Sequence, residues 1–202
     1  RRQRQMCIRD RFIIMKDLLS IVSHFQLQGT VQEINPLGAG LINDTYKVST
    51  LEADAPDYVL QRINHAIFQN VEMLQANINA VTTHIRKKLE EKGEKDIERK
   101  VLHFFPADTG KTYWHDGESY WRVMAFIPNA RTYETVNPEY SYYAGVAFGN
   151  FQAMLADIPD KLGETIPDFH NMEFRLKQLR DAVAADAAGR VKEVRYFLDE
   201  IE

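Results

Sequence analysis

Two segments rich in strand-forming residues flank the sequence Pro36-Leu37-Gly38-Ala39-Gly40-Leu41-Ile42-Asn43-Asp44-Thr45-Tyr46. Val31–Pro36 before the glycines and Leu41–Leu51 after them are both predicted to be strands. Two glycines let a backbone turn tightly and bring its N–H groups close to an anion. The pattern is not a P-loop, because no Gly-Lys-Ser/Thr follows, and it is not a dinucleotide fingerprint, because a helix does not come next. By itself, a plain hairpin turn explains the same residues.

Hydrophobic periodicity predicts the remaining elements. Further strands are predicted at Asp57–Asn64, Lys100–Phe105 and Tyr120–Ile127, with turns over Ala107–Gly117. Helices are predicted at Phe12–Gln28, Val71–Glu91, Asn137–Ala156 and Phe174–Ile201, the last with a break at Gly189. The sequence therefore predicts an α+β protein, in which about five antiparallel strands and one long helix precede a helical segment.

The third predicted strand carries a cation. Alternate side chains of a strand point to opposite faces, so Leu60 and Arg62 share one face while Gln61 points to the helix side or to solvent. If Leu60 and Arg62 face a cleft, Arg62 points under the glycine turn, where a kinase holds nucleotide phosphates. The alternative is a surface arginine on an edge strand. Glu72 is a candidate partner for Arg62, although an acid in the first turn of a helix also complements the helix dipole.

Composition excludes several classes of protein. The 202 residues have 45% hydrophobic and 27% charged side chains, enough to build a core, which argues against disorder throughout. No stretch of ~18 apolar residues spans a membrane, and a net charge of -4 argues against general nucleic-acid binding. The single cysteine, Cys7, favours a cytoplasmic location. No metal-ligand spacing is present among His65, His84, His103, His115 and His170.

Three segments differ in character. Residues 1–11 hold five arginines and one aspartate and are interpreted as non-native, the alternative being a basic arm that binds phosphate or an acidic partner. Residues 12–130 form the predicted strand-rich lobe, and residues 131–202 the predicted helical one, with a hinge at 127–131. An aromatic run in the first helix after the hinge is predicted to be packing core: Tyr140, Tyr142, Tyr143, Phe148 and Phe151.

Taken in order, these elements resemble the protein-kinase-like fold of the aminoglycoside phosphotransferase and choline kinase superfamily. The closest resemblance is to its N-acetylhexosamine 1-kinase branch. Five segments carry it: Leu37–Tyr46 (LGAGLINDTY), Tyr58–Asn64 (YVLQRIN), Trp121–Ile127 (WRVMAFI) with Arg131–Tyr133, Ala144–Gln152 (AGVAFGNFQ) and Glu164–Asn171 (ETIPDFHN).

The resemblance implies roles for particular residues. Gly38, Gly40 and Asn43 would form the loop over the phosphates of ATP, with Asn43 in the third-glycine position because asparagine tolerates unusual backbone angles. Arg62 stands where such kinases place a strand lysine or arginine on the α- and β-phosphates. The nucleotide-binding strand end and hinge would be Met124, Phe126 and Ile127, whose backbone meets the adenine. His170 and Arg175 would bind substrate in the helical lobe.

The sequence departs from the family in one respect that matters for activity. The family's catalytic loop reads His-Asn/Gly-Asp followed four residues later by Asn, and a further aspartate binds metal; these groups position the hydroxyl and hold Mg²⁺. No such motif occurs in these 202 residues. No catalytic or metal-binding residue is therefore assigned. The chain is interpreted as an incomplete reading frame, a fragment that holds a nucleotide pocket but is itself inactive.

The predicted function is that of an N-terminal fragment of an ATP-dependent kinase. The parent would transfer the γ-phosphoryl group to a sugar hydroxyl, the anomeric hydroxyl of an N-acetylhexosamine, with Mg²⁺ as cofactor. Its partners would be ATP and the sugar, with no nucleic acid and no membrane. One alternative is another aminoglycoside- or choline-kinase-like phosphotransferase, acting on choline, fructosamine, homoserine or an aminoglycoside. The other is a non-catalytic nucleotide-binding module.

Overall fold

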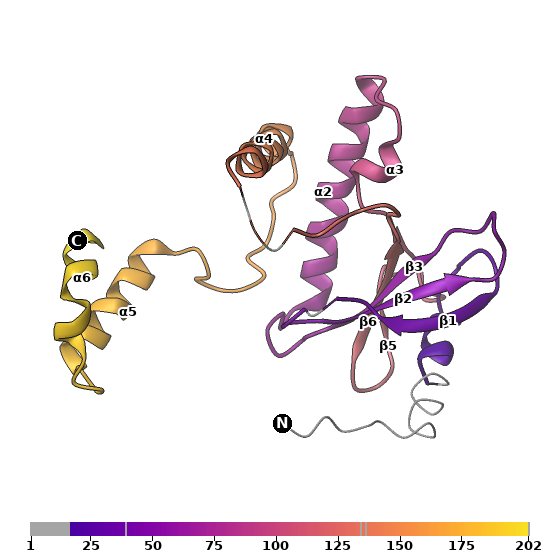
Figure 1. The fold of residues 1–202 in the computed structure, drawn as a ribbon. Helices are drawn as coiled ribbons and strands as arrows, with labels where there is room; N and C mark the ends of the chain where they lie inside the picture. Colours follow the sequence, from indigo (N-terminus) through magenta and orange to yellow (C-terminus); the bar gives the residue numbers. More distant parts are fainter. Residues whose placement is uncertain (1–16, 39, 134, 136, 202) are drawn as a thin grey trace. The chain divides into compact units, whose positions relative to one another are not determined.

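Figure 1 shows the fold in a computed structural model, which describes residues 17–38, 40–133, 135 and 137–201. The chain divides between Thr165 and Ile166 into two compact units. The first unit holds the whole sheet and its long helix, and the second is helical. The predicted α+β class, an antiparallel sheet followed by helices, is confirmed. The division into lobes after residue 130 stays a prediction.

The sheet has six strands, and every pairing in it is antiparallel. Its strands are β1 (Val31–Pro36), β2 (Asp44–Thr50), β3 (Tyr58–Ile63), β4 (Phe104–Phe105), β5 (Trp114–His115) and β6 (Tyr120–Ala125). Their order in space is β1-β2-β3-β6-β4, and β5 pairs separately with β6. Strand β3 therefore lies in the middle, with a neighbour along each edge.

The glycine turn joins β1 to β2 as a hairpin. The N–H of Leu37 donates to the carbonyl of Thr45 (2.8 Å), which closes the base of the turn. Gly38 has φ +76°, a left-handed conformation that residues with a Cβ adopt only with strain. A strand, not a helix, follows the glycines, so the predicted strand–turn–strand arrangement is confirmed.

One face of the sheet packs on α2 (Val71–Glu91), whose bounds match the predicted helix. Asn70 caps its first turn, because its side chain accepts a hydrogen bond from the N–H of Met73 (2.9 Å). Val71 and Leu74 of the helix form a buried cluster with Ile63 of β3. Figure 1 shows α2, in magenta, running beside the sheet.

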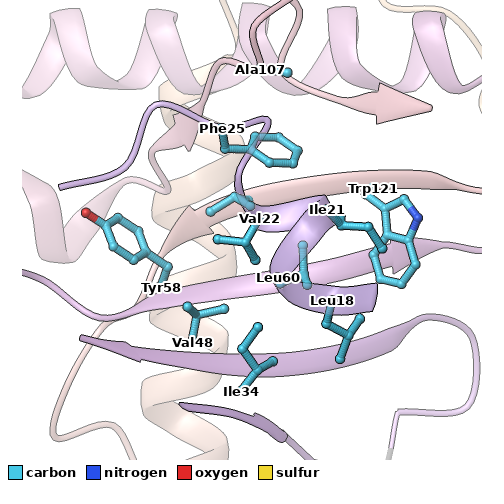
Figure 2. Close-up of a cluster of buried hydrophobic side chains, with 11 residues drawn as sticks. Leu18, Ile21, Val22, Phe25, Ile34, Val48, Tyr58, Leu60, Ala107 and Trp121 are labelled. Carbon is cyan, nitrogen blue, oxygen red and sulfur yellow. The ribbon is translucent and has the colours of Figure 1, made fainter. Parts of the chain in front are cut away.

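The other face of the sheet carries the main core. The buried side chains of this cluster come from residues 17–25, from four strands and from the loop after β4, and Figure 2 labels most of them: Leu18, Ile21, Val22, Phe25, Ile34, Val48, Tyr58, Leu60, Ala107, Trp121 and Val123. The predicted helix Phe12–Gln28 is too long at its C-terminal end, since within that segment the described helix covers residues 17–22 and ends there. Phe25 forms a β-bridge with Ala107 and so has left the helix. Residues 12–16 lie outside the described chain.

Two short elements also differ from prediction. The predicted strand Lys100–Phe105 shrinks to β4, because Lys100 belongs to α3 (Ile97–Lys100) and residues 101–103 form no strand. Within the predicted turns, Trp114 and His115 form β5 opposite Trp121 and Tyr120. A strand of two residues is too short to show a periodic pattern in the sequence, so β5 is recognised only by its pairing with β6.

The helix after the hinge, α4 (Pro138–Leu155), is held to α2 at its C-terminal end. Lys88 and His84 of α2 both bond the carbonyl of Met154 (2.8 and 3.1 Å), and Lys88 also pairs with Asp157. The predicted aromatic core is wrong, because the earlier turns of α4 find no such anchor among the described residues. All five aromatic side chains of that run are exposed: Tyr140, Tyr142, Tyr143, Phe148 and Phe151.

The second unit contains α5 (Met172–Ala185), a 3-10 turn at Val191–Val194 and α6 (Arg195–Ile201). The predicted break at Gly189 is confirmed, and Gly189 itself has φ +64°. Throughout the described residues, no helix is both long enough and apolar enough to cross a membrane.

The buried position of Leu60 predicts a large loss of stability in Leu60→Ala. Leu60 is fully buried, so truncation leaves a cavity in the main core and should lower the free energy of unfolding by about 2–5 kcal/mol. Leu41→Ala is the matched control, because Leu41 is fully exposed and should change that energy by less than about 0.5 kcal/mol. Urea unfolding followed by circular dichroism measures both. Equal losses would contradict this description of the core.

Candidate functional site

The glycine turn presents its backbone to solvent. Gly38 and Gly40 are both exposed, and Leu41 next to them has no cover among the described residues. Asn43 was expected to adopt an unusual backbone angle, but it is not among the residues with positive φ. It acts through its side chain instead, accepting a hydrogen bond from the N–H of Asn64 (2.9 Å). Asn43 therefore ties the end of the turn to the end of β3.

The predicted alternation along β3 is confirmed. Leu60 lies in the main core, whereas Gln61, one residue on, belongs to a network that reaches α2. Arg62 pairs with Asp44 of β2 and so returns to the face of Leu60. Leu60 itself faces no cleft, because it is sealed under residues 17–25, whereas Arg62 lies beyond that cover at the edge of a groove.

Arg62 has acidic surroundings. Its Nε donates to Asp44 Oδ2 (2.6 Å), and a second guanidinium nitrogen contacts the same oxygen. It lines a groove whose other charged residues are all acidic: Asp17, Asp44, Asp116 and Glu118. It also borders a hollow lined by Leu41 and Ile42, which follow the glycine turn. A carboxylate-rich groove repels phosphate, so this geometry gives no support to a phosphate role for Arg62, which stays a prediction.

Glu72 does not pair with Arg62. Its carboxylate accepts a hydrogen bond from Lys111 Nζ (3.0 Å), which also donates to the hydroxyl of Tyr113. Glu72 is well exposed in the first turn of α2, where a negative charge complements the helix dipole. The structure therefore favours the interpretation of Glu72 as an acid that complements the helix dipole over its interpretation as the partner of Arg62.

A different arginine lies on the α2 face of the sheet. Arg122 of β6 donates from Nε and Nη2 to the amide oxygen of Gln61 (3.0 and 2.7 Å). Its Nη1 donates to the amide oxygen of Gln75 on α2 (2.9 Å). The guanidinium also lies over the ring of Phe104, with its carbon 5.4 Å from the ring centroid. Two glutamines and one aromatic ring therefore fix its position.

The two glutamines extend this contact into a continuous polar strip. Gln61 Nε2 donates to the hydroxyl of Thr45, the first residue after Asp44 in β2 (2.9 Å). Gln75 Nε2 donates to the carbonyl of Thr112 (2.9 Å). Together these side chains form a polar strip that runs from β2, behind the glycine turn, across the sheet to α2 and the segment before β5. Its members are Thr45, Gln61, Arg122, Gln75 and Thr112.

Burial lowers the pKa of Arg122 to about 10. At neutral pH the guanidinium stays protonated, so the strip carries a positive charge. Gln75 is buried, and its neutral amide oxygen accepts a hydrogen bond from the charged guanidinium of Arg122. Within the described chain, only amide oxygens accept hydrogen bonds from Arg122, and no carboxylate forms an ion pair with it.

A cleft of about 650 Å³ opens beside this strip. Its lining includes Gln61, Arg122, Phe104 and Met124 from the sheet, with Leu74 and Ile78 from α2. Most of the lining is apolar and the charged guanidinium lies in its wall, a combination typical of small-molecule sites. Among the residues predicted to bind nucleotide, Met124 is the one that lines this cleft.

The predicted hinge follows β6. The N–H of Phe126 donates to the carbonyl of Asp57 (3.1 Å), while no backbone bond is found for the N–H of Ile127 among the described residues. Asn129 has φ +59°, and Arg99 donates to the carbonyl of Pro128 (2.8 Å). A left-handed residue and a side-chain tether thus mark the place where the chain leaves the sheet.

The predicted substrate residues lie in the second unit, where both are exposed. Arg175 Nη1 donates to Gln178 (2.8 Å), and His170 packs edge-on against Phe169. Asn171 caps α5 by accepting from the N–H of Phe174 (3.0 Å). These contacts are internal to the unit, so the roles of His170 and Arg175 toward a substrate stay predictions.

A family comparison adds to this geometry. The model of the phosphotransferase enzyme family (APH) matches residues 33–202. The chain belongs to this family. The match begins in β1 and includes the glycine turn, the polar strip and the helices, and it supports the predicted aminoglycoside phosphotransferase and choline kinase superfamily.

Phosphotransferases with kinase-like folds hold the nucleotide phosphates with a lysine on a sheet strand, and in protein kinases that lysine pairs with a helix glutamate. In this chain the side chains that β3 and α2 contribute to the same contact are Gln61 and Gln75. The cation of that contact is Arg122, on the neighbouring strand β6. Metal ligands were not assigned from the sequence, and the described residues contain no group of three His, Cys, Asp or Glu suited to a metal ion.

Sequence reasoning missed Arg122, Gln61 and Gln75 as a group. Two local signals were present: Arg122 interrupts an otherwise apolar strand, and Gln75 lies on the apolar face of the predicted helix, one residue after Leu74. Neither signal says that the two side chains meet, because that depends on how the helix is placed on the sheet.

Opposite faces of β3 predict unequal costs for two neighbouring substitutions. Gln61→Ala removes an acceptor that Arg122 uses twice, and should lower the free energy of unfolding by about 1–3 kcal/mol. Arg62→Ala removes a half-exposed ion pair and should cost less than about 1 kcal/mol. Urea unfolding of the two variants makes the comparison. A greater loss in Arg62→Ala would show that the assignment of faces is wrong.

Proposed function

We propose that the protein is an ATP-dependent kinase that phosphorylates a sugar hydroxyl, and that these 202 residues supply its nucleotide-binding part. The observation that carries this proposal is the pairing, on one sheet, of an exposed glycine turn with a half-buried cationic strip that begins at Thr45, directly behind that turn. Membership of the phosphotransferase family gives the reaction class.

The nucleotide would bind between the glycine turn and the hinge. The exposed backbone of Gly38 and Gly40 offers N–H groups to phosphate oxygens. At the other end, Met124 and Ile127 would border the adenine, and the N–H of Ile127 is the hinge donor that remains, because Phe126 already bonds Asp57. Backbone contacts of this kind suit a planar base and need no particular side chain.

The chemistry is transfer of the γ-phosphoryl group. The bond between the γ-phosphorus and the β–γ bridging oxygen breaks, a new bond forms to the acceptor oxygen, and the hydroxyl proton passes to a base. Catalysis of this kind consists mostly of positioning and charge stabilisation. Mg²⁺ would neutralise the phosphates, and the described residues contain no cluster of three His, Cys, Asp or Glu side chains to hold it.

The acceptor proposed is the anomeric hydroxyl of an N-acetylhexosamine. This choice rests on the resemblance of five segments to that branch, with His170 and Arg175 as the proposed sugar-binding side chains. Both are exposed and polar, which is compatible with hydroxyl and carbonyl recognition. The second candidate is a non-catalytic nucleotide-binding module, favoured by the lack of a His-x-Asp-x4-Asn motif in the sequence.

Binding without turnover is the expected behaviour of the 202-residue chain. Isothermal titration with ATP should show saturable binding. A coupled ADP assay with Mg²⁺ and N-acetylglucosamine or N-acetylgalactosamine should stay near background, because the sequence has no His-x-Asp-x4-Asn motif to supply the base. ADP production that depends on either sugar would refute the inactivity. Failure to bind ATP would refute the nucleotide site.

The coding sequence downstream of Glu202 distinguishes the two candidate functions. Sequencing beyond the codon for Glu202 should reveal His-x-Asp-x4-Asn if the protein is a kinase. A protein extended through that motif should then phosphorylate N-acetylhexosamines in preference to choline, homoserine or an aminoglycoside. Preference for one of those acceptors would keep the kinase but replace its substrate, and a reading frame without the motif would favour the non-catalytic module.

A further inference from the structure

We propose that Arg122 is the side chain that binds the nucleotide phosphates, and that Gln61 and Gln75 position it for that purpose. This inference rests on the proposed nucleotide site and names a cation for it that the sequence did not. It assigns the phosphate contact to β6 instead of β3.

The first argument is the charge of Arg122. A guanidinium held between a sheet and a helix loses hydration, and that loss is usually offset by a carboxylate partner. In the part of the chain described by the structure, its partners are the neutral amides of Gln61 and Gln75. Those bonds use one N–H on each of its three nitrogens. A guanidinium has five N–H groups, so Nη1 and Nη2 each keep one for an external anion.

The second argument is that the other cations near the sheet are already paired. Lys47 binds Asp57 (2.8 Å), Lys111 binds Glu72 (3.0 Å) and Arg62 binds Asp44. A phosphate would have to compete with a carboxylate at each of them. At Arg122 it meets an unneutralised charge, and a guanidinium fork suits two phosphate oxygens at once.

The third argument is position. Gln61, which accepts two hydrogen bonds from Arg122, donates to Thr45 directly behind the glycine turn. Arg122 and Gln61 both line the 650 Å³ cleft. In this proposal a phosphate chain that enters from the turn runs along the α2 face of the sheet and meets Arg122. Arg62 borders the hollow beside Leu41 and Ile42, but its charge there is already paired with Asp44 at the edge of an acidic groove.

The glutamines explain how the charge can stay available. A glutamate at either position would form an internal ion pair with Arg122 and compete with phosphate. An amide oxygen fixes the guanidinium through hydrogen bonds but leaves its charge uncompensated. The arrangement thus orients the cation in the absence of ligand.

The experiment measures binding of inorganic tripolyphosphate, ATP and adenosine to the 202-residue chain by isothermal titration. In Arg122→Met, affinity for tripolyphosphate and ATP should fall roughly ten- to a hundredfold, the effect of losing a charged hydrogen bond. Adenosine, which has no phosphate, should bind as before. Arg86→Met is the matched control, because it also removes one arginine, here from an exposed pair with Glu98, and should leave all three affinities unchanged.

A second variant separates binding from folding. Gln61→Glu supplies Arg122 with a carboxylate, so urea unfolding should show unchanged or increased stability while phosphate affinity falls. A purely structural Arg122 would show the gain in stability with no change in phosphate affinity. This variant keeps the test valid if Arg122→Met fails to fold.

The outcomes distinguish this inference from the proposed function. If ATP binds and Arg122→Met and Gln61→Glu leave its affinity unchanged, the inference is overturned and the nucleotide site stands. A larger loss in Arg62→Met than in Arg122→Met overturns it in the same way. Tripolyphosphate binding that needs Arg122, without ATP binding, supports the inference and refutes the nucleotide. Binding of neither refutes both.

Discussion

The pairing of β3 with β2 on one side and β6 on the other is the constraint on which the rest of the structure depends. It fixes Leu60 toward the main core and Gln61 toward α2. Because side chains alternate, a slip of one residue would place an amide in the core and a leucine against Arg122. Each mismatch opposes the slip, so the central strand specifies both faces of the sheet at once.

The α2 face is unusual because it holds a charge where a core would normally be apolar. Ile63 and Leu74 belong to a buried cluster whose residues neighbour Arg122's partners Gln61 and Gln75 in the sequence. The strip persists because every amide oxygen and hydroxyl in it has a partner, from Thr45 at one end to Thr112 at the other. A network in which each of these polar groups has a hydrogen-bond partner holds its side chains in one arrangement.

The glycine turn and the strip depend on each other through backbone geometry. Leu37 closes the hairpin on Thr45, and the Thr45 hydroxyl accepts from Gln61. Asn43 then ties the turn to Asn64 beyond β3. The exposed glycine turn is therefore anchored at its end to β3, the strand whose Gln61 holds Arg122 in place.

The sequence by itself determined the elements whose signals are local. The bounds of α2 follow from its 3.6-residue periodicity and the cap at Asn70, and the hairpin follows from two glycines between strand-forming residues. Alternation placed Arg62 with Leu60, but no sequence pattern says which face of a sheet will be covered. Only the tertiary structure decided that residues 17–25 seal that face, that β5 exists, and that Arg122 and Gln75 meet. The physical reason is that these are contacts between distant segments, whose packing selects one of the faces that local periodicity leaves equivalent.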